Sequence, residues 1–305
     1  MDAVPVRHDD AWPELPLEAW SDTYATLHMW SQVVGKVRMA GTPPANHWWH
    51  VPLYLTSRGL TTSPIPDGDR TFQIDFDFIG HRLDIATSDG DGRSLTLRPL
   101  AVADFHAETM AALADLDIEV KIWPVPVEVP DPIPFRDDRV HAAYDPTWAH
   151  RFWCALVQAD RVAKAFRDDF LGKASPVHFF WGSFDLASTR FSGRTAPPHP
   201  GAPGVADSIT REAYSHECWS AGWWPGAGLG EPAFYAYAYP EPDGFRDWAV
   251  EPAAAYYHPD LREYVLPYEA VRTDDEPDTA LLSFLRTTYE AAAERGGWDR
   301  ETLER

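Results

Sequence analysis

The segment Asn46–Pro66 reads NHWWHVPLYLTSRGLTTSPIP, and the rest of the fold can be worked out from it. It combines two histidines, large aromatic residues and an arginine with an exit loop of Gly, Thr, Ser and Pro. A second segment, His178–Arg194, reads HFFWGSFDLASTRFSGR and has the same character. Because aromatic and β-branched residues favour strands, we expect strands at about 47–56 and 177–188.

The two segments occupy corresponding places in two similar halves of the chain. In each half a long helix precedes the aromatic strand, and a hairpin, a strand that ends at proline and a further helix follow it. His47 then corresponds to His178, and Arg58 corresponds to Arg190 after a one-residue insertion. Self-similarity of this kind indicates a duplicated module of about 130 residues, although two unrelated α+β patterns could also converge on this order.

We therefore expect an α+β fold of two tandem, pseudo-symmetric modules, each an antiparallel sheet with flanking helices. The predicted modules are residues 1–135 and 136–305, packed as one globular unit. Apolar residues recur every three or four positions in the predicted helices, as one buried helix face requires. These helices cover about 17–40, 102–115, 146–171 and 277–294.

The segment 72–87 is the clearest hairpin, because phenylalanine and isoleucine alternate with mostly polar residues along it. A two-residue turn at 80–81 would place Asp77 directly opposite Asp84. Like charges in that position are destabilising. We expect Arg82, which lies diagonally from Asp77 on the same face, to supply the opposite charge.

The remaining segments predict less regular structure. Residues 118–135 are rich in proline and should form an edge strand that runs into an extended linker, since proline cannot donate within a central ladder. Residues 208–219 should form a strand, and residues 220–226 a mobile aromatic loop that could act as a lid. Residues 233–251 should form a second hairpin that turns at Pro-Glu-Pro-Asp-Gly.

Composition limits the classes of function. The chain has 305 residues, with 26 basic against 47 acidic side chains and a net charge of −21. So negative a protein repels phosphate backbones, and we expect it not to bind nucleic acid. Two cysteines give no disulfide framework, and no run of about 18 apolar residues could span a membrane. We expect a cytoplasmic protein that does not contact membranes.

Polar side chains alternate with core side chains along both aromatic segments. The mixed faces carry Trp48, His50 and Tyr54 in the first segment, and Trp181 and Asp185 in the second. Aromatic rings together with a few hydrogen-bonding groups are typical of a pocket wall. The alternative is a half-buried sheet face that a helix covers, with each polar tip bonded to the backbone.

Arginines follow both aromatic segments, beside Gly, Ser and Thr. If Arg58, Arg190 and Arg194 converge, they could bind a carboxylate or a phosphate bidentately. The alternative is that they form salt bridges with Asp185 or with the carboxylates of the hairpin.

The segment Tyr214–Cys218 supplies further candidates for catalysis. His216 and Cys218 would share one face of a strand, and Glu217 would point to the other. Either His50 or His216 could serve as acid or base, with Asp185 or Glu217 orienting it. Cys218 could be an activated thiolate, but a lone buried cysteine is more often a small hydrophobic residue.

The sequence identifies no metal and no cofactor. His47 and His50 have a metal-like spacing, yet on a strand their rings diverge, and no paired Cys motif or HExxH supports a zinc site. A metal at this place would need ligands from the second half of the chain. No glycine-rich dinucleotide or phosphate-binding motif is present either.

Several longer motifs together resemble a bacterial domain-of-unknown-function family over nearly the whole chain. The motifs are WPELPLEAW, TLHMWSQVVGKVRMA, NHWWHVPLYLTSRGLTTSPIP, IDFDFIGHRLDI, FWGSFDLASTRFSGR, YSHE and FYAYAYPEP. The resemblance implies a cytoplasmic single-chain protein. It implies no activity, substrate or catalytic residue, because none is established for that family.

Three functions fit these observations. The first is an enzyme that acts on a small anionic or polar metabolite, held by the arginines and aromatic residues in a cleft between the modules. The second is a non-catalytic module whose aromatic faces stack on a sugar or a heteroaromatic ligand. The third is an oligomeric scaffold, in which tryptophan- and proline-rich surfaces form contacts between copies of the chain.

Overall fold

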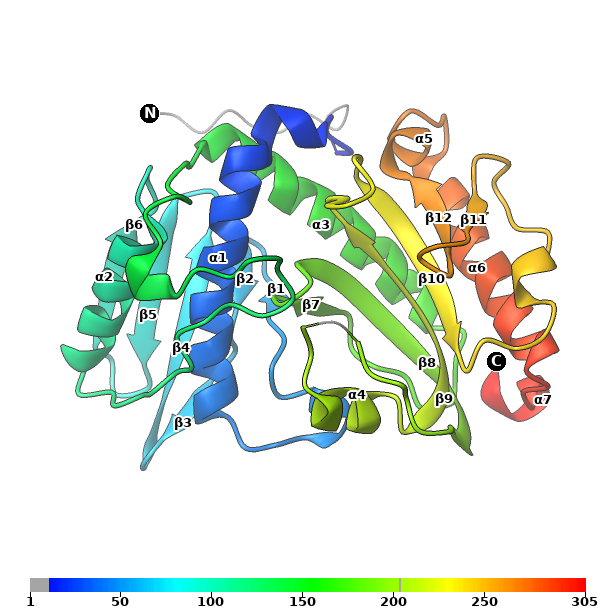
Figure 1. The fold of residues 1–305 in the computed structure, drawn as a ribbon, viewed down its shortest axis with the longest axis horizontal. Helices are drawn as coiled ribbons and strands as arrows, with labels where there is room; N and C mark the ends of the chain where they lie inside the picture. Colours follow the sequence, from blue (N-terminus) through cyan, green and yellow to red (C-terminus); the bar gives the residue numbers. More distant parts are fainter. Residues whose placement is uncertain (1–10, 203) are drawn as a thin grey trace.

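The structure, a computed structural model, describes residues 11–202 and 204–305. Two antiparallel sheets with flanking helices form an α+β fold, which confirms the predicted class and its two-module arrangement (Figure 1). The first half of the chain builds the sheet on the left of Figure 1, and the second half builds the sheet on the right. We call them the first sheet and the second sheet.

The first sheet has the strand order β1-β2-β4-β5-β6, and β3 also pairs with β4. Its strands are β1 (Tyr54–Leu55), β2 (Gly59–Thr61), β3 (Ile65–Asp67), β4 (Arg70–Asp77), β5 (Arg82–Thr87) and β6 (Gly92–Thr96). The helical elements of this half are α1 (Leu17–Gly41), the 3-10 turns η2 (Asn46–Trp48) and η3 (Phe135–Asp137), and α2 (Val102–Ala114). Helices α1 and α2 pack on one face of the sheet, where Trp30 stacks on Phe105 at 4.6 Å between ring centroids.

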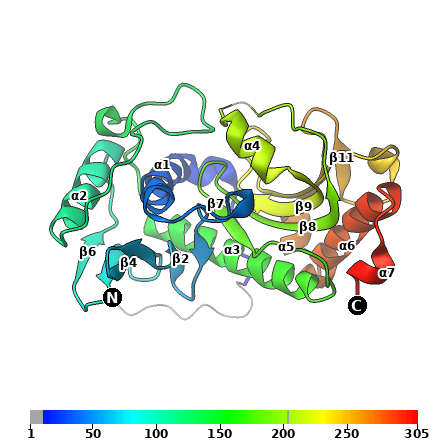
Figure 2. The ribbon, with the colours of Figure 1, turned by 90° about the horizontal axis from the view of Figure 1, so that it is seen from below.

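The second sheet has the order β11-β12-β10-β9-β8-β7. Its strands are β7 (His178–Phe180), β8 (Asp185–Thr195), β9 (His216–Trp224), β10 (Ala233–Tyr239), β11 (Tyr256–His258) and β12 (Glu263–Pro267). The helical elements are α3 (Pro146–Arg167), α4 (Asp207–Ala213), η4 (Phe245–Asp247), α5 (Tyr268–Arg272), α6 (Pro277–Arg295) and α7 (Arg300–Leu303). Figure 2 shows α3 on one side of β8 and β9 and α4 on the other.

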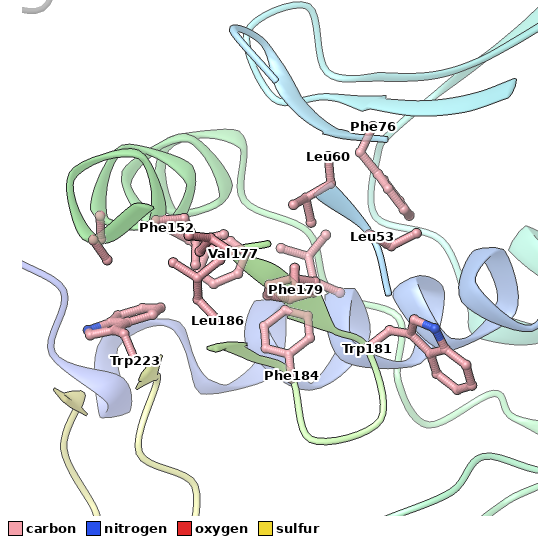
Figure 3. Close-up of a cluster of buried hydrophobic side chains, with 14 of the residues drawn as sticks. Leu53, Leu60, Phe76, Phe152, Val177, Phe179, Trp181, Phe184, Leu186 and Trp223 are labelled. Atoms are coloured by element: carbon pink, nitrogen blue, oxygen red, sulfur yellow. The ribbon is translucent and has the colours of Figure 1, made fainter. Parts of the chain in front are cut away.

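The two sheets meet at Leu53 and Phe179. The backbone N–H of each residue donates to the carbonyl of the other, and both N···O distances are 2.9 Å. Apolar side chains from both halves surround this bridge, among them Leu60 and Phe152 (Figure 3). A continuous hydrophobic core therefore runs through both halves. The predicted boundary at residue 135 stays a prediction.

The two halves begin with the same order of elements, although the second half also has α4 between β8 and β9. Each begins with a long helix, α1 or α3, and continues with a short strand at the junction and an antiparallel meander. Strand β1 thus corresponds to β7, and β2 corresponds to β8. The residue correspondence differs from the predicted one, because His47 precedes β1 whereas His178 begins β7. Internal duplication remains a prediction.

The predicted helices form, because their signals are local in sequence. Helix α3 begins at an N-cap that the sequence shows directly: the Asp145 carboxylate accepts the N–H groups of Thr147 and Trp148 at 2.8 and 3.3 Å. Helices α1, α2 and α6 lie within two residues of their expected limits, whereas α3 ends at Arg167, four residues before its expected end.

The two predicted aromatic strands are much shorter than expected. Both His47 and Trp48 have positive φ angles, 57° and 61°, which a continuous strand excludes. Only Tyr54–Leu55 of the range 47–56 is a strand. In the second segment, Phe184 has φ 59° at the end of a turn, so that the range 177–188 forms the hairpin β7–β8.

The hairpin β4–β5 is present, but its predicted register was wrong. Asp77 lies opposite Arg82, and Asp75 lies opposite Asp84. The connection is longer than two residues because Asp77 accepts the N–H groups of Ile79 and Gly80 and so stabilises a wider turn. The expected ion pair between Arg82 and Asp77 forms at 3.4 Å.

Four other predictions of local structure were also wrong. The range 208–219 begins as helix α4 and not as a strand. Residues 220–224 continue strand β9, with Trp223 fully buried, and do not form the predicted mobile lid. Strand β10 pairs with β9 and β12, so residues 233–251 do not form a hairpin. Residues 118–134 form no strand and run as irregular chain past α1. Within the described ranges, no helix is both long and apolar enough to cross a membrane.

Candidate functional site

A cavity of about 760 Å³ lies over the face of the second sheet that faces away from α3 and α6. Residues 24–29 of α1 form one wall, and the segment 128–133 and the loop 227–229 form others. The floor comes from strands β8, β10 and β12. We call this space the sheet cavity.

Strand alternation determines which side chains reach the floor. In β10, Phe234 and Ala236 belong to the hydrophobic core, whereas Tyr235 and Tyr237 line the cavity. Asp185 begins β8 and Glu263 begins β12, and both line the same space. The cavity floor is therefore polar although it lies on a central part of the sheet.

A glycine makes the centre of the floor possible. Gly222 of β9 lies directly opposite Tyr235, and a Cβ at this position would come within 2.5 Å of the Tyr235 hydroxyl. Without that side chain, Tyr235 crosses β9 and donates its hydroxyl hydrogen bond to Oδ2 of Asp185 on β8. The Ser183 hydroxyl donates to Oδ1. Burial raises the pKa of Asp185, and these two hydrogen bonds oppose the shift.

Glu128 approaches Asp185 from the opposite wall. A Cβ at Gly182 would lie 2.1 Å from Oε1 of Glu128, so this glycine lets the carboxyl group come close. The Glu128 side chain is exposed to the solvent that fills the cavity, yet protein surrounds it on most sides. Partial desolvation, followed by the charge of Asp185, raises the pKa of Glu128 to about 7.

Helix α1 holds the segment that carries Glu128. The Gln32 amide donates to the Val127 carbonyl and accepts the Val127 N–H, both at 2.8 Å. His28, one turn earlier, donates from Nε2 to the Gly182 carbonyl at 2.8 Å. Burial lowers the pKa of His28 to about 4, so its ring is neutral near pH 7 and serves to position both segments.

Glu263 completes a group of three carboxyl groups. Burial, followed by the charge of Asp185, raises its pKa to about 8. Neither Glu128 nor Glu263 has a hydrogen-bonding or ion-pairing side chain within the part of the chain that is described. The described lining contains no lysine and no arginine either.

Aromatic side chains form much of the remaining lining. Tyr24 comes from α1, Trp224 from β9, and Tyr214 from the segment between α4 and β9. The hydroxyl groups of Tyr214 and Tyr237 are hydrogen-bonded at 2.8 Å. The cavity can thus stack on a ligand and bond to its polar groups at the same time.

Of the ten site residues that the sequence predicted, only Asp185 lines the sheet cavity. Trp48, His50 and Tyr54 lie in and after the turn η2. Nδ1 of His50 accepts the Ala45 N–H at 3.2 Å, and burial lowers its pKa. The Tyr54 ring lies 5.4 Å from the Arg38 guanidinium. Trp181 is buried against Gly35 and donates to the Val51 carbonyl at 2.8 Å.

The three predicted arginines do not converge. Arg58 pairs with Asp77 at 2.8 Å. Arg190 is buried 3.7 Å from the Phe166 ring and donates to the Phe166 carbonyl, and burial lowers its pKa to about 10. Arg194 pairs with Glu217 at 2.6 Å. Each is held within the chain. Arg58 forms the expected salt bridge with a hairpin carboxylate, whereas the partner of Arg194 is Glu217 and not one of the expected carboxylates.

The predicted pair of His216 and Glu217 does not act as a unit. His216 lies 5.6 Å from the His47 ring, with its Nδ1 3.1 Å from the Ser215 hydroxyl, whereas Glu217 binds Arg194 and Ser192. Cys218 is buried, and burial raises the pKa of its thiol to about 12, so it is not a thiolate. No group of three or more metal-ligating side chains occurs among the residues placed in the structure.

The sequence did carry one signal for the true lining. In the run AFYAYAY, residues 233–239, alternate residues share one face of the strand, and Tyr235, Tyr237 and Tyr239 all lie on the same face. Glu128 and Glu263 gave no such signal, because a carboxylate in a proline-rich segment and one in a strand are ordinary surface residues until the fold encloses them. The need for a glycine at position 222 likewise becomes clear only when the fold places Tyr235 opposite it on the neighbouring strand.

Residues 12–305 match a family described as a family of unknown function, DUF5996. The match covers nearly the whole chain, and the protein belongs to this family. The comparison with curated proteins found no match to the chain, and the comparison with solved structures found none. The site must therefore be interpreted from its own chemistry.

Proposed function

We propose that the protein binds a small polar organic molecule in the sheet cavity and acts on it as an acid–base enzyme. The observation that carries this proposal is the group of three carboxyl residues, Asp185, Glu128 and Glu263, that share one cavity. The pKa values of Glu128 and Glu263 are about 7 and about 8. Near neutral pH, the ionised form that accepts a proton and the protonated form that donates one are therefore both populated.

The surroundings of the carboxyl groups suggest different roles. Two hydroxyl donors hold Asp185 in one orientation, which suits a group that fixes the ligand or stabilises charge on it. Glu128 is a partly desolvated residue of the cavity lining, on a segment that Gln32 anchors. It can exchange protons with solvent and with a bound molecule, as a general acid or base must.

This proposal changes the predicted ligand. An anionic metabolite held by arginines has little support, because Arg58, Arg190 and Arg194 contact other parts of the chain and not the cavity. A polar ligand in an aromatic-lined cavity remains the better description. We also propose that the protein is bacterial and works in the cytoplasm; both cysteines are free thiols, which supports a reducing compartment.

A non-catalytic binding module is the second candidate. The aromatic lining from Tyr24, Tyr214 and Trp224 favours it, since stacking requires no proton transfer. The scaffold hypothesis has less support, because Trp219 and Trp223 are buried in the core of their own chain. A homo-oligomer that uses other surfaces stays a proposal.

Metabolite profiling tests the enzyme against the binding module. The full chain and its Asp185→Asn variant would each be incubated with a mixture of polar metabolites, and consumption would be followed by liquid chromatography and mass spectrometry. We expect the wild type to consume at least one compound that the variant leaves intact.

Native mass spectrometry of the same samples provides the control. A compound that binds the wild type without being consumed would favour the binding module. The variant Ala25→Phe, which fills the cavity from α1, should abolish binding, whereas Ala40→Phe on the exposed end of the same helix should not. If Ala25→Phe leaves binding unchanged, the sheet cavity is not the site.

A further inference from the structure

We propose that the ligand of the sheet cavity carries a protonated amine, which lies among the carboxyl groups of Asp185, Glu128 and Glu263. This inference rests on the proposed function and specifies the class of its ligand. Three independent properties of the cavity support it: its charge, the donors that its oxygen atoms need, and its aromatic walls.

The lining of the described cavity contains several carboxylates and no lysine or arginine. Asp131 adds a fourth carboxylate near the rim. Elsewhere the chain does pair a buried carboxylate with cations, as Asp77 with Arg58 and Arg82 shows. Carboxylates that are close together and partly desolvated repel one another unless protons or a cation intervene. A cationic ligand would supply the charge that the described lining lacks.

The oxygen atoms of the site need hydrogen-bond donors. An ionised carboxylate only accepts hydrogen bonds, and an ammonium group offers three donors and no acceptor. Asp185 already accepts one hydroxyl on each oxygen, and it lines the cavity. Glu128 and Glu263 accept none from a side chain in the described residues. A primary amine therefore matches this set of acceptors better than an acid or an ether does.

Aromatic rings complete the match and argue for an organic cation. Tyr24, Tyr237 and Trp224 line the walls around the carboxyl groups. The faces of such rings attract cations, and the attraction grows where water is excluded. A metal ion would instead require a cluster of ligating side chains, and the described residues contain no such cluster.

Binding of an amine should be coupled to protons. The titratable groups that face the cavity from all its elements are His28, His141, Asp131, Asp185, Glu128, Glu263, Tyr24, Tyr214, Tyr235 and Tyr237. His28 stays neutral near pH 7, and the pKa values of these tyrosines are raised, mainly by burial. Among the carboxyl groups of the cavity, Glu128 and Glu263 have pKa values raised to about 7 and about 8. An ammonium ion favours their ionised forms, so its binding releases protons, and its affinity rises between pH 6 and pH 8.

Three probes of equal length but different charge test the inference. Isothermal titration calorimetry of the full chain, at physiological ionic strength, would use hexamethylenediamine, the neutral hexamethylene glycol and the dianion adipate. We expect the diamine to bind roughly tenfold or more tightly than the glycol, and adipate not to bind. Titrations in two buffers of different ionisation enthalpy should show proton release for the diamine alone.

Single substitutions of glutamate test whether diamine binding depends on the carboxyl groups of the cavity. Glu128→Gln and Glu263→Gln should each weaken diamine binding by about tenfold. Glu119→Gln removes the same unit of charge at an exposed position outside the cavity and should change nothing. If Glu119→Gln weakens binding as much, the diamine responds only to the net charge of −21, and the inference is wrong.

The remaining outcomes separate this inference from the proposed function. If the glycol or adipate binds as tightly as the diamine, or if the diamine does not bind at all, the amine class is wrong. The proposed small-molecule function can still stand in that case, because it fails only if no polar metabolite binds in the native mass spectrometry experiment.

Discussion

Asp77 and Glu263 are both carboxylates at the end of a sheet strand, one in each half of the molecule, yet they have opposite environments. Asp77 is 3% exposed and pairs with Arg58 and Arg82. Glu263 faces the sheet cavity with no cationic partner in the described residues. The comparison shows that arginines neutralise the carboxylate of the first sheet, whereas the carboxylate at the cavity has no such partner among the described residues.

The two environments shift the pKa values in opposite directions. Burial alone would raise the pKa of Asp77, but the Gly80 N–H, the Arg58 guanidinium and the Ile79 N–H together lower it. Its stabilising effect is therefore present above the pKa of the unfolded chain and is lost as the pH falls. For Glu263 the pKa rises from its ordinary 4.5 to about 8, so the folded state loses stability as the pH rises through this interval.

Among the variants that test this comparison, Asp77→Ala should change the free energy of unfolding the most. It leaves Arg58 and two turn N–H groups without their acceptor, while Arg82 keeps Asp84, and should lower the free energy of unfolding by about 3 kcal/mol at pH 7. Urea unfolding followed by tryptophan fluorescence measures the change. Asp69→Ala, at an exposed turn position, is the control and should change it by less than about 0.5 kcal/mol. Equal effects of the two variants would show that the contacts of Asp77 stabilise the fold no more than an exposed aspartate does.

Gly222→Ala and Gly59→Ala compare the two sheets directly. A Cβ at either position would lie 1.9 Å from a carbonyl oxygen, that of Leu186 or of Phe76, so each variant should lose about 1–3 kcal/mol. Only Gly222→Ala also displaces the Tyr235 hydroxyl from Asp185. It alone should weaken the binding of hexamethylenediamine in calorimetry, and equal affinities in both variants would contradict the proposed role of Gly222.

Tyr235→Phe should have a smaller effect. It removes the hydroxyl that donates to Asp185 and should lower the free energy of unfolding by about 1.5 kcal/mol. The pKa of Asp185 should rise further, because the lost hydrogen bond favours the ionised form; carbon-detected NMR titration measures this. Tyr239→Phe, whose hydroxyl donates to the Pro197 carbonyl, is the control on the same strand and should leave the pKa of Asp185 unchanged.

Glu263→Gln should have the smallest effect, and it should be stabilising. At pH 8.5 the variant removes a partly buried, unpaired charge and should raise the free energy of unfolding by on the order of 0.5–1 kcal/mol, after allowance for solvent in the cavity. Below pH 5 the difference should vanish, since the wild-type carboxyl group is then protonated. Melting temperatures across this pH range check the prediction, and a destabilised variant at pH 8.5 would contradict it.

Local signals in the sequence predicted most of the helices and the existence of the first hairpin. The N-cap at Asp145 and the spacing of apolar residues along α3 depend only on near neighbours. The register of β4 and β5 could not be read in the same way, because the Asp77 side chain sets the length of the turn. Positive φ angles at His47, Trp48 and Phe184 likewise interrupted strands that composition alone predicted.

The candidate site was harder to predict, and Asp185 is the single predicted residue that lines the cavity. Arg190 shows the reason. Its position after an aromatic strand suggested an anion site, but Phe166, Phe170 and Tyr289 surround its guanidinium in the core. Whether a charged residue is free to bind a ligand depends on residues far away in the chain.

The sequence by itself determined the α+β class, the long helices and the negative charge, because these follow from the spacing and number of residue types. The tertiary structure alone decided which carboxylates are neutralised by arginine and which face an open space. Glu128 and Glu263 are 135 positions apart, and each is unremarkable until the fold encloses both with Asp185. Their shifted pKa values arise from desolvation and from mutual repulsion, and both require three-dimensional proximity.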